Sequence, residues 1–210
     1  MEALDQISTT LALTMGLAWA SGINLYATLF TLGYLANTGN MDLPADLQIV
    51  ANPMVMGAAG LMYCIEFFAD KIPGVDTAWD TLHTFVRIPA GAMLAAGAIG
   101  DMNPAIEITA AILGGSLAAG THVTKAGSRV LINASPEPFT NWTASIGEDI
   151  AVIGGVWACL NHPALFLVAL VFFIALMIWL IPKILKGIKK VFQFIINLFS
   201  KKEHSSPSQQ

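Results

Sequence analysis

Charge is scarce in this sequence. Only 11% of the 210 residues are charged and 55% are hydrophobic, whereas a soluble globular domain carries roughly 25% charged residues. This shortage excludes an ordinary soluble domain and predicts a protein whose main surroundings are the lipid bilayer. The formal net charge is -4, and the one basic cluster adjoins an apolar run, so we expect no nucleic-acid partner.

Cysteine and local catalytic signatures are scarce as well. The two cysteines, Cys64 and Cys159, each lie inside an apolar run, which predicts neither a disulfide framework nor a C-x-x-C metal motif. The sequence contains no phosphate-binding glycine loop, nucleophile elbow or H-E-x-x-H motif. We therefore assign no catalytic residue, no metal and no cofactor, and we favour a protein that is not an enzyme.

Apolar segments dominate residues 1–181. A transmembrane helix needs about 20 residues, and the run 163–181 meets this length by itself. We predict an all-α polytopic membrane protein, a helical bundle with four to six spans. The apolar segments lie at about 10–36, 53–69, 88–100, 104–120, 142–160 and 163–181.

The two ends of the chain differ in charge. The first ten residues carry acidic side chains and no Lys or Arg, unlike a cleaved signal peptide, so we expect the first segment to remain as a membrane helix. Residues 182–200 are basic and then apolar, which predicts an interfacial amphipathic helix, followed by a disordered tail at 201–210. Lys and Arg favour cytoplasmic flanks, so this end is predicted to be cytoplasmic. Six of the ten basic residues lie here: Lys183, Lys186, Lys189, Lys190, Lys201 and Lys202.

Other charged residues lie in or beside the apolar segments. An ionised side chain at mid-membrane costs on the order of 3 kcal/mol, so such groups must face one another or a water-filled cavity. Helical spacing predicts an acidic pair, a mixed stripe and a basic stripe on separate faces. The candidate ion or substrate pathway comprises Asn24, Glu66, Asp70, Asp80, His83, Arg87, His122, Lys125, Arg129, Glu148 and Asp149.

Three simpler interpretations of these charges remain open. Residues 70–87 would be an interfacial loop with a short amphipathic helix and its charges in water, which we favour for Lys71 and Asp76 because they flank Pro73 and Gly74. The ion pairs would serve structure alone. A divalent cation would find oxygen ligands among the carboxylates, but Lys125 and Arg129 would compete with it, so we predict no metal.

A weak internal repeat relates two segments. LAWASGINLYATLFTL and GSLAAGTHVTKAGSRVL each contain a small residue and a glycine, followed two residues later by a polar side chain; Gly22 and Gly120 are 98 residues apart. Inverted repeats with broken helices are common in secondary transporters. We predict two related halves, about 7–100 and 104–181, with broken or re-entrant helices. Small residues at close helix contacts would explain the same pattern.

Three longer motifs carry a family resemblance. EFFADKIPGVDTAWDTLHTFVRIPAGAM, KAGSRVLINASPEPFTNWTASIGED and ASGINLYAT resemble the signatures of a bacterial membrane family catalogued as domain of unknown function 4126, over about residues 8–181. The resemblance implies a multi-pass protein of the bacterial inner membrane and supplies no activity. Within SPEPFTNW, we expect Thr140 or Asn141 to cap the helix that carries Glu148.

These observations favour a small transporter or channel-like protein that moves an ion or a small polar solute. Glu66 and Asp70 would bind a cation or relay protons, while the basic stripe would pair with them or with an anionic substrate. The alternatives are an intramembrane enzyme acting on lipid headgroups and a non-catalytic assembly or scaffold protein. The expected partner is the lipid bilayer, and homo-oligomerisation is left open.

Overall fold

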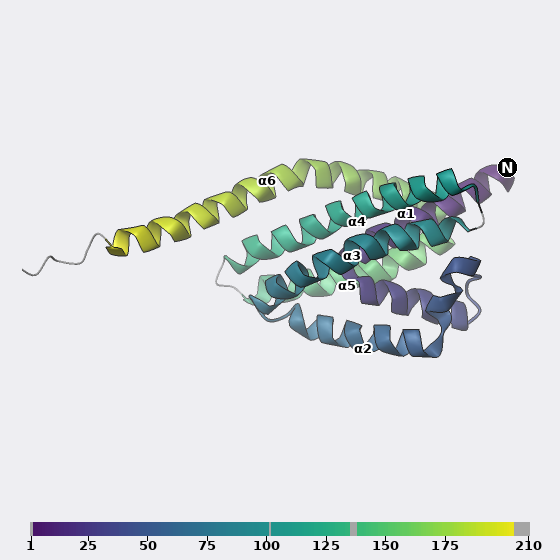
Figure 1. Ribbon diagram of the computed structural model, residues 1–210, viewed down its shortest axis with the longest axis horizontal. Helices are drawn as coiled ribbons and strands as arrows, with labels where there is room; N and C mark the ends of the chain where they lie inside the picture. The colour runs from purple at the N-terminus through teal and green to yellow at the C-terminus, as the bar shows by residue number, and fades with distance from the viewer. Residues whose placement is uncertain (1, 101, 135–137, 204–210) are drawn as a thin grey trace, which may run out of the picture.

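The computed structural model describes residues 2–100, 102–134 and 138–203, and every regular element in them is a helix. The prediction of an all-α membrane bundle is therefore confirmed. Figure 1 shows long helices packed side by side, with the last one extending far beyond the bundle. In chain order the elements are α1 (Glu2–Asn37), the 3-10 helix η1 (Ala45–Ala51), α2 (Pro53–Ala69), α3 (Val75–Ile99), α4 (Pro104–Asn133), α5 (Pro138–Asn161) and α6 (Pro163–Glu203).

Four helices are long and apolar enough to cross a membrane: α3, α4, α5 and α6. A fifth candidate span is the pair η1 and α2, which is bent by 65° at its junction. Helix α2 begins at Pro53 and α4 at Pro104, and the preceding Asn52 and Asn103 side chains cap their first turns. Proline suits these positions because no backbone donor is lost there.

Helices α3 and α4 are longer than the apolar runs that predicted them. The charged residues from Asp76 to Arg87 form the first half of α3, and the basic stripe forms the second half of α4. The interpretation that the charges of 70–87 lie in water is wrong for Asp76, Asp80 and Arg87, which are all buried. Asp76 is fully buried and accepts hydrogen bonds from Asn133 Nδ2, at 2.8 and 2.9 Å. Lys71 does lie in the turn between α2 and α3.

Helix α1 is broken at Asn24, whose backbone angles (φ -147°, ψ 100°) are not helical. Both ends of α1 lie at the same end of the bundle. Ile7 lines a hollow together with Ile99 at the end of α3, and Asn37 Nδ2 donates a hydrogen bond to the carbonyl of Ala51 in η1, at 2.7 Å. Leu47 of η1 in turn packs against Gly97 of α3. We therefore describe α1 as a re-entrant hairpin with Asn24 at its tip, as the two arms in Figure 1 show.

The break in α1 has no counterpart in α4, which is helical through Gly120 and His122. The two segments that suggested a repeat thus differ at that feature, and the relation between the two halves stays a prediction. Small residues do bring the helices close. A Cβ atom added to Gly22 would lie 2.6 Å from the Ala118 carbonyl oxygen, and one added to Gly114 would overlap Ala95. This is the close packing that small residues allow in membranes.

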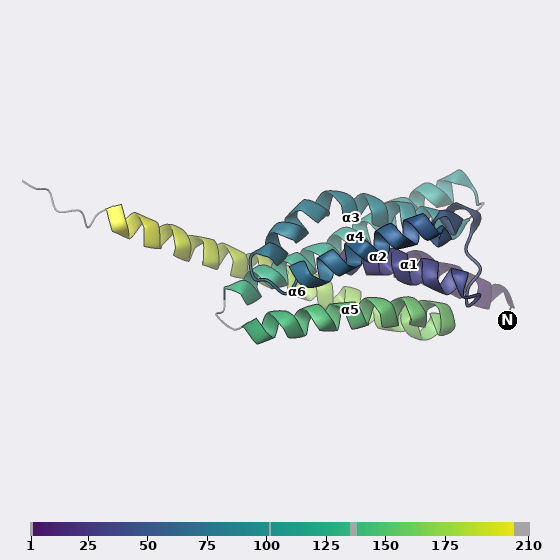
Figure 2. The same cartoon turned by 90° about the horizontal axis from the view of Figure 1, so that it is seen from below.

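Helix α6 continues across the boundary predicted at residue 182, with Pro182 inside it. Ile184 is buried and packs against Gly127 of α4, Gly187 packs against Leu131, and beyond these contacts the helix leaves the bundle (Figure 2). Residues 182–200 are thus the last part of α6, and their placement at the membrane surface stays a prediction. The helix reaches Glu203, and residues 204–210 of the predicted tail lie outside the described residues.

Candidate functional site

Eight charged side chains from α2, α3, α4 and α5 meet near the tip of the α1 hairpin. We call this group the charged cluster. The side chains that form its ion pairs are 0–3% exposed, apart from Glu148 at 21%. Asp149 is joined to the group through Asn24 at the hairpin tip. The members are the carboxylates Glu66, Asp70, Asp80, Glu148 and Asp149 and the bases Arg87, Lys125 and Arg129.

Arg87 joins α2 to α3 and α4. Its Nη2 atom lies 2.5 Å from Glu66 Oε1, and its Nη1 atom lies 2.9 Å from Asp80 Oδ1 and 3.1 Å from His122 Nδ1. A guanidinium only donates, so His122 Nδ1 accepts and the imidazole is neutral. His122 Nε2 then donates to Thr84 Oγ1 at 2.8 Å, and the Thr84 hydroxyl donates to the Asp80 carbonyl at 3.0 Å. These contacts fix the tautomer of His122.

Lys125 lies at the centre of the cluster, and one of its partners is a backbone group released by the break in α1. Ala27 N donates to Asn24 Oδ1, so the second arm begins with a side-chain cap. The Ile23 carbonyl, which an unbroken helix would pair with Ala27 N, accepts from Lys125 Nζ instead. The oxygen atoms around Nζ are Asp70 Oδ2 at 2.9 Å, Ile23 O at 3.0 Å, Glu66 Oε1 at 3.3 Å, Glu148 Oε2 at 3.6 Å and Asp80 Oδ1 at 3.7 Å.

Arg129 ties the end of α2 to α5. Its Nη2 atom lies 2.6 Å from Glu148 Oε2, and its Nη1 atom donates to the carbonyls of Asn141 and Asp70 at 3.0 and 3.3 Å. The Asn141 side chain accepts from the same guanidinium and donates to the Asp70 carbonyl at 3.1 Å. The predicted cap is wrong, because α5 begins at Pro138 and Asn141 lies inside the helix. Residues 135–137 of that motif are outside the described residues.

Two of the predicted pathway residues lie at the edge of the cluster. Asn24 Nδ2 donates to Asp149 Oδ1 at 3.1 Å. His83 is directed at α1 and its own helix: Nδ1 donates to the Trp79 carbonyl at 2.8 Å, and Nε2 accepts from the Tyr26 hydroxyl at 3.1 Å. The Trp79 ring stacks on the imidazole with the two centroids 4.2 Å apart. His83 therefore supports the helix contact rather than the carboxylates.

The sequence interpretation missed several polar members of this region. Asn133 follows Arg129 by one helical turn. Asn141 and Ser145, whose hydroxyl oxygen lies 3.5 Å from Lys71 Nζ, precede Glu148 at helical spacing, so the pattern that predicted the charged stripes also includes these residues. The role of Ile23 could not be predicted from the sequence, because its contribution is a backbone carbonyl that becomes available only where the helix breaks.

Carboxylates outnumber bases in the charged cluster. Five acids against three bases leave a formal excess of two negative charges. Within the described part of the chain, four of the buried carboxylates each keep one oxygen without a hydrogen-bond donor, namely Glu66 Oε2, Asp70 Oδ1, Asp80 Oδ2 and Asp149 Oδ2. Burying such oxygens unpaired is costly. Among the same described residues no group of three or more His, Cys, Asp or Glu side chains is arranged to hold a metal ion.

Lys71 lies beside the cluster, in the turn that follows α2. Its Nζ atom donates to the Phe67 carbonyl at 2.9 Å and lies 3.0 Å from the centroid of the Phe67 ring. Partial burial lowers the pKa of Lys71, because the ammonium loses solvation there. Lys71 is therefore a partly covered cation at the end of the bundle where α6 emerges.

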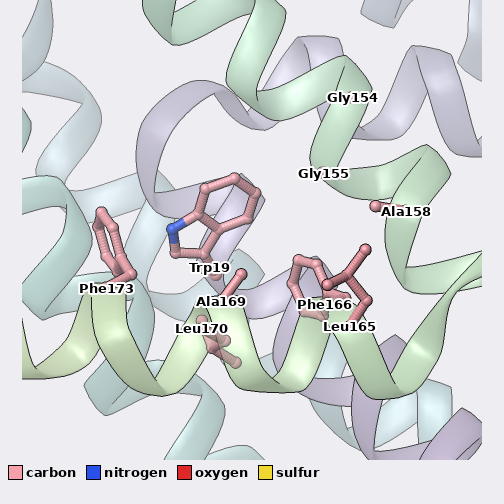
Figure 3. A pocket seen from close by; sticks show the side chains of 9 residues that line it. All are labelled: Trp19, Gly154, Gly155, Ala158, Leu165, Phe166, Ala169, Leu170 and Phe173. Carbon is pink, nitrogen blue, oxygen red and sulfur yellow. The ribbon is translucent and has the colours of Figure 1, made fainter.

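A separate, apolar cavity of about 400 Å³ lies between α1, α5 and α6 (Figure 3). Trp19, Phe166 and Phe173 form its walls together with Gly155, whose missing side chain leaves room for the Trp19 ring. Its lining consists of apolar side chains and glycines, so it is not part of the charged cluster.

The fold and the site together define a class: a polytopic helical membrane protein whose bundle encloses an ionic cluster at the tip of a re-entrant helix. The chain belongs to the family described as Domain of unknown function (DUF4126), whose sequence profile matches residues 11–183. This confirms the family resemblance. No curated protein and no solved structure matches the chain.

Proposed function

We propose that this protein moves a small cation, or protons, across the membrane through the charged cluster. The observation that carries the proposal is the buried excess of carboxylates over bases. Each base is already in contact with at least one carboxylate, so the surplus charge favours a cationic rather than an anionic guest.

The hairpin of α1 supports the same proposal. Broken helices place free backbone groups and helix ends at the binding sites of many transporters. Here the first arm ends at Ile23, whose carbonyl faces Lys125, and the second arm begins at Asn24, which contacts Asp149. The hairpin therefore extends from one end of the bundle and places the free backbone groups of its tip beside the buried carboxylates, as re-entrant helices do in channels and transporters.

The distribution of basic residues supports a cytoplasmic C-terminus in a bacterial inner membrane. Lys71 and the lysines of α6 lie at the end of the bundle from which α6 emerges. At the opposite end, the described loops at 38–52 and 161–162 carry Asp42 and Asp46 and no Lys or Arg. Basic residues mark cytoplasmic flanks, so the two arms of α1 enter from the outer side.

Purified protein in sealed vesicles tests the proposal. Proton flux and the uptake of Na⁺, K⁺ and NH₄⁺ are measured under an imposed gradient, and we expect flux above that of protein-free vesicles. Glu66→Gln should lower it at least about tenfold, because one buried charge controls the pathway. Glu107→Gln, an exposed carboxylate in the first turn of α4, is the matched control and should leave flux unchanged. Wild-type protein without flux contradicts the proposal, as does full flux in the combined variant Glu66→Gln, Asp70→Asn and Arg129→Gln.

A scaffold role is the second candidate, favoured by the direct ion pairs and by the burial of the cluster. Buried ion pairs fix helix register without moving anything. In that case the same variants lower stability while wild-type vesicles show no flux. The burial of the carboxylates also disfavours an enzyme acting on lipid headgroups, since such a site must open to one leaflet.

A further inference from the structure

The five oxygen atoms around Lys125 Nζ form an arrangement that we call the oxygen cage. Four are carboxylate oxygens from three helices, and the fifth is the Ile23 carbonyl at the tip of α1. An ammonium is a compact point charge on a flexible stem of four methylene groups. Its surroundings are therefore those of a bound cation, here one that is tethered to α4.

We propose that the position of Lys125 Nζ is the binding site of a monovalent cation about the size of ammonium, and that Lys125 occupies it until the transported cation displaces it. This rests on the proposed function and names its substrate class. The distances from Nζ to the cage oxygens run from 2.9 to 3.7 Å. Mg²⁺ and Ca²⁺ need oxygens at about 2.0–2.6 Å, so the cage is too wide for them and is closer in size to a larger monovalent cation such as NH₄⁺ or K⁺, around which the more distant oxygens would have to move inward.

The unpartnered carboxylate oxygens support this site. Glu66, Asp70 and Asp80 are each 0–2% exposed, and each offers the cage one oxygen while its second oxygen has no donor among the described residues. A cation that enters beside Lys125 would meet these oxygens first. The excess of two negative charges allows the cation and the ammonium to be present together before one leaves.

The geometry of the other bases assigns the displaceable role to Lys125. Arg87 holds two carboxylates, one through each terminal nitrogen, whereas Arg129 holds Glu148 through Nη2 and two backbone carbonyls through Nη1. A fork of this kind fixes geometry. Lys125 has one terminal atom, and its side chain withdraws by rotation about its own bonds without disturbing α4.

The test is cation-specific stabilisation of purified Lys125→Gln, which removes the tethered charge and leaves the cage. Thermal unfolding is followed in K⁺, NH₄⁺, Na⁺ or Mg²⁺ chloride, with choline chloride holding ionic strength constant. We expect a saturable rise in Tm of about 5–10 °C in K⁺ or NH₄⁺ at about 100 times Kd. Wild-type protein should respond more weakly, because its own ammonium competes for the same oxygens. Lys71→Gln, which removes a lysine outside the cage, is the matched control and should behave like the wild type.

Each outcome decides the proposal. Lys125→Gln that folds in K⁺ but not in choline supports it; Lys125→Gln that folds without cation-specific stabilisation overturns it. If this variant folds in no salt, Lys125→Gln combined with Glu148→Gln restores the formal charge of the wild type, and it must gain stability in K⁺ or NH₄⁺. Failure of the double variant to fold or to respond overturns the proposal. If cations stabilise Lys125→Gln but wild-type vesicles show no flux, the proposed transport function is contradicted and the cation site stands. If wild-type vesicles show flux but cations do not stabilise the variant, the cation site is contradicted and the transport function stands.

Discussion

Lys125 Nζ lies 3.0 Å from the Ile23 carbonyl oxygen, although the two residues are 102 positions apart in the chain. The contact exists because the amide of Ala27 donates to the Asn24 side chain, which leaves the Ile23 carbonyl free to accept from Lys125. The break in α1 and the charge on α4 therefore satisfy each other. A helix break in a membrane must be compensated by buried partners. The hairpin and the charged cluster are therefore one structural unit.

The cap at the hairpin tip is the first prediction. Asn24→Ala removes the acceptor of Ala27 N and the donor to Asp149, and should lower the free energy of unfolding by about 1–3 kcal/mol. Thermal unfolding of purified protein measures it. Asn161→Ala is the matched control: Asn161 is exposed and bonds only to Trp157 on its own helix among the contacts of the described chain, so its loss should stay within about 0.5 kcal/mol. Equal losses in both variants would contradict the role of the tip.

Arg87 is predicted to matter most through the acids that it pairs. In Arg87→Met, Glu66 and Asp80 lose the guanidinium that pairs with both of them, which should lower the free energy of unfolding by about 3–5 kcal/mol. Adding Glu66→Gln should restore part of this loss, because a neutral amide no longer needs the cation. Chemical denaturation of the two single variants and the double variant gives the coupling energy. Simple additivity of the two effects would show that the pair does not interact.

The contact between α1 and α4 gives a third prediction. In Gly22→Ala the new methyl group would lie 2.6 Å from the Ala118 carbonyl oxygen, so the helices must separate, at about 1–3 kcal/mol. In Gly57→Ala nothing lies within 4 Å of the new atom, and stability should be kept or slightly raised. Unfolding temperatures of the two variants check this. If Gly22→Ala does not lower the unfolding temperature, the hairpin is not packed against α4.

A topology experiment tests the re-entrant hairpin. Single cysteines are introduced as Asp5→Cys, Thr38→Cys and Lys71→Cys in a background that lacks Cys64 and Cys159. A membrane-impermeant maleimide added to intact cells should label positions 5 and 38 alike, because both arms of α1 reach the same side. Position 71 should react only after the membrane is opened. Labelling of positions 5 and 38 from opposite sides would make α1 a single span.

Helical periodicity predicted most of the charged cluster. Residues 80 and 87 on α3, and 122, 125 and 129 on α4, meet because their spacing places each set on one face and because lipid offers an ion no other partner. His83 shares the spacing of α3 but lies at its edge, against Tyr26. The repeat argument anticipated broken helices, and the break at Asn24 lies two residues beyond the glycine that suggested it.

The rest depended on contacts distant in sequence. The apolar run at 10–36 is long enough for a span, and only the acceptors and donors around Asn24 and Lys125 make a hairpin favourable there. Asp76 follows a proline and a glycine and therefore resembles a loop residue, yet Asn133 on α4 provides the donors that allow its burial. Local sequence contains neither partner.

The re-entrant α1 is synthesised before the helices whose side chains hold its tip in place. The ribosome delivers the hairpin first, but the carboxylates and the ammonium that satisfy its exposed tip arrive only when α2, α4 and α5 have been synthesised. Until then the polar groups of the tip need other hydrogen-bond partners, which water, lipid headgroups or the insertion machinery can provide. The hairpin is thus synthesised before the helices that hold its tip and reaches its final depth only after them.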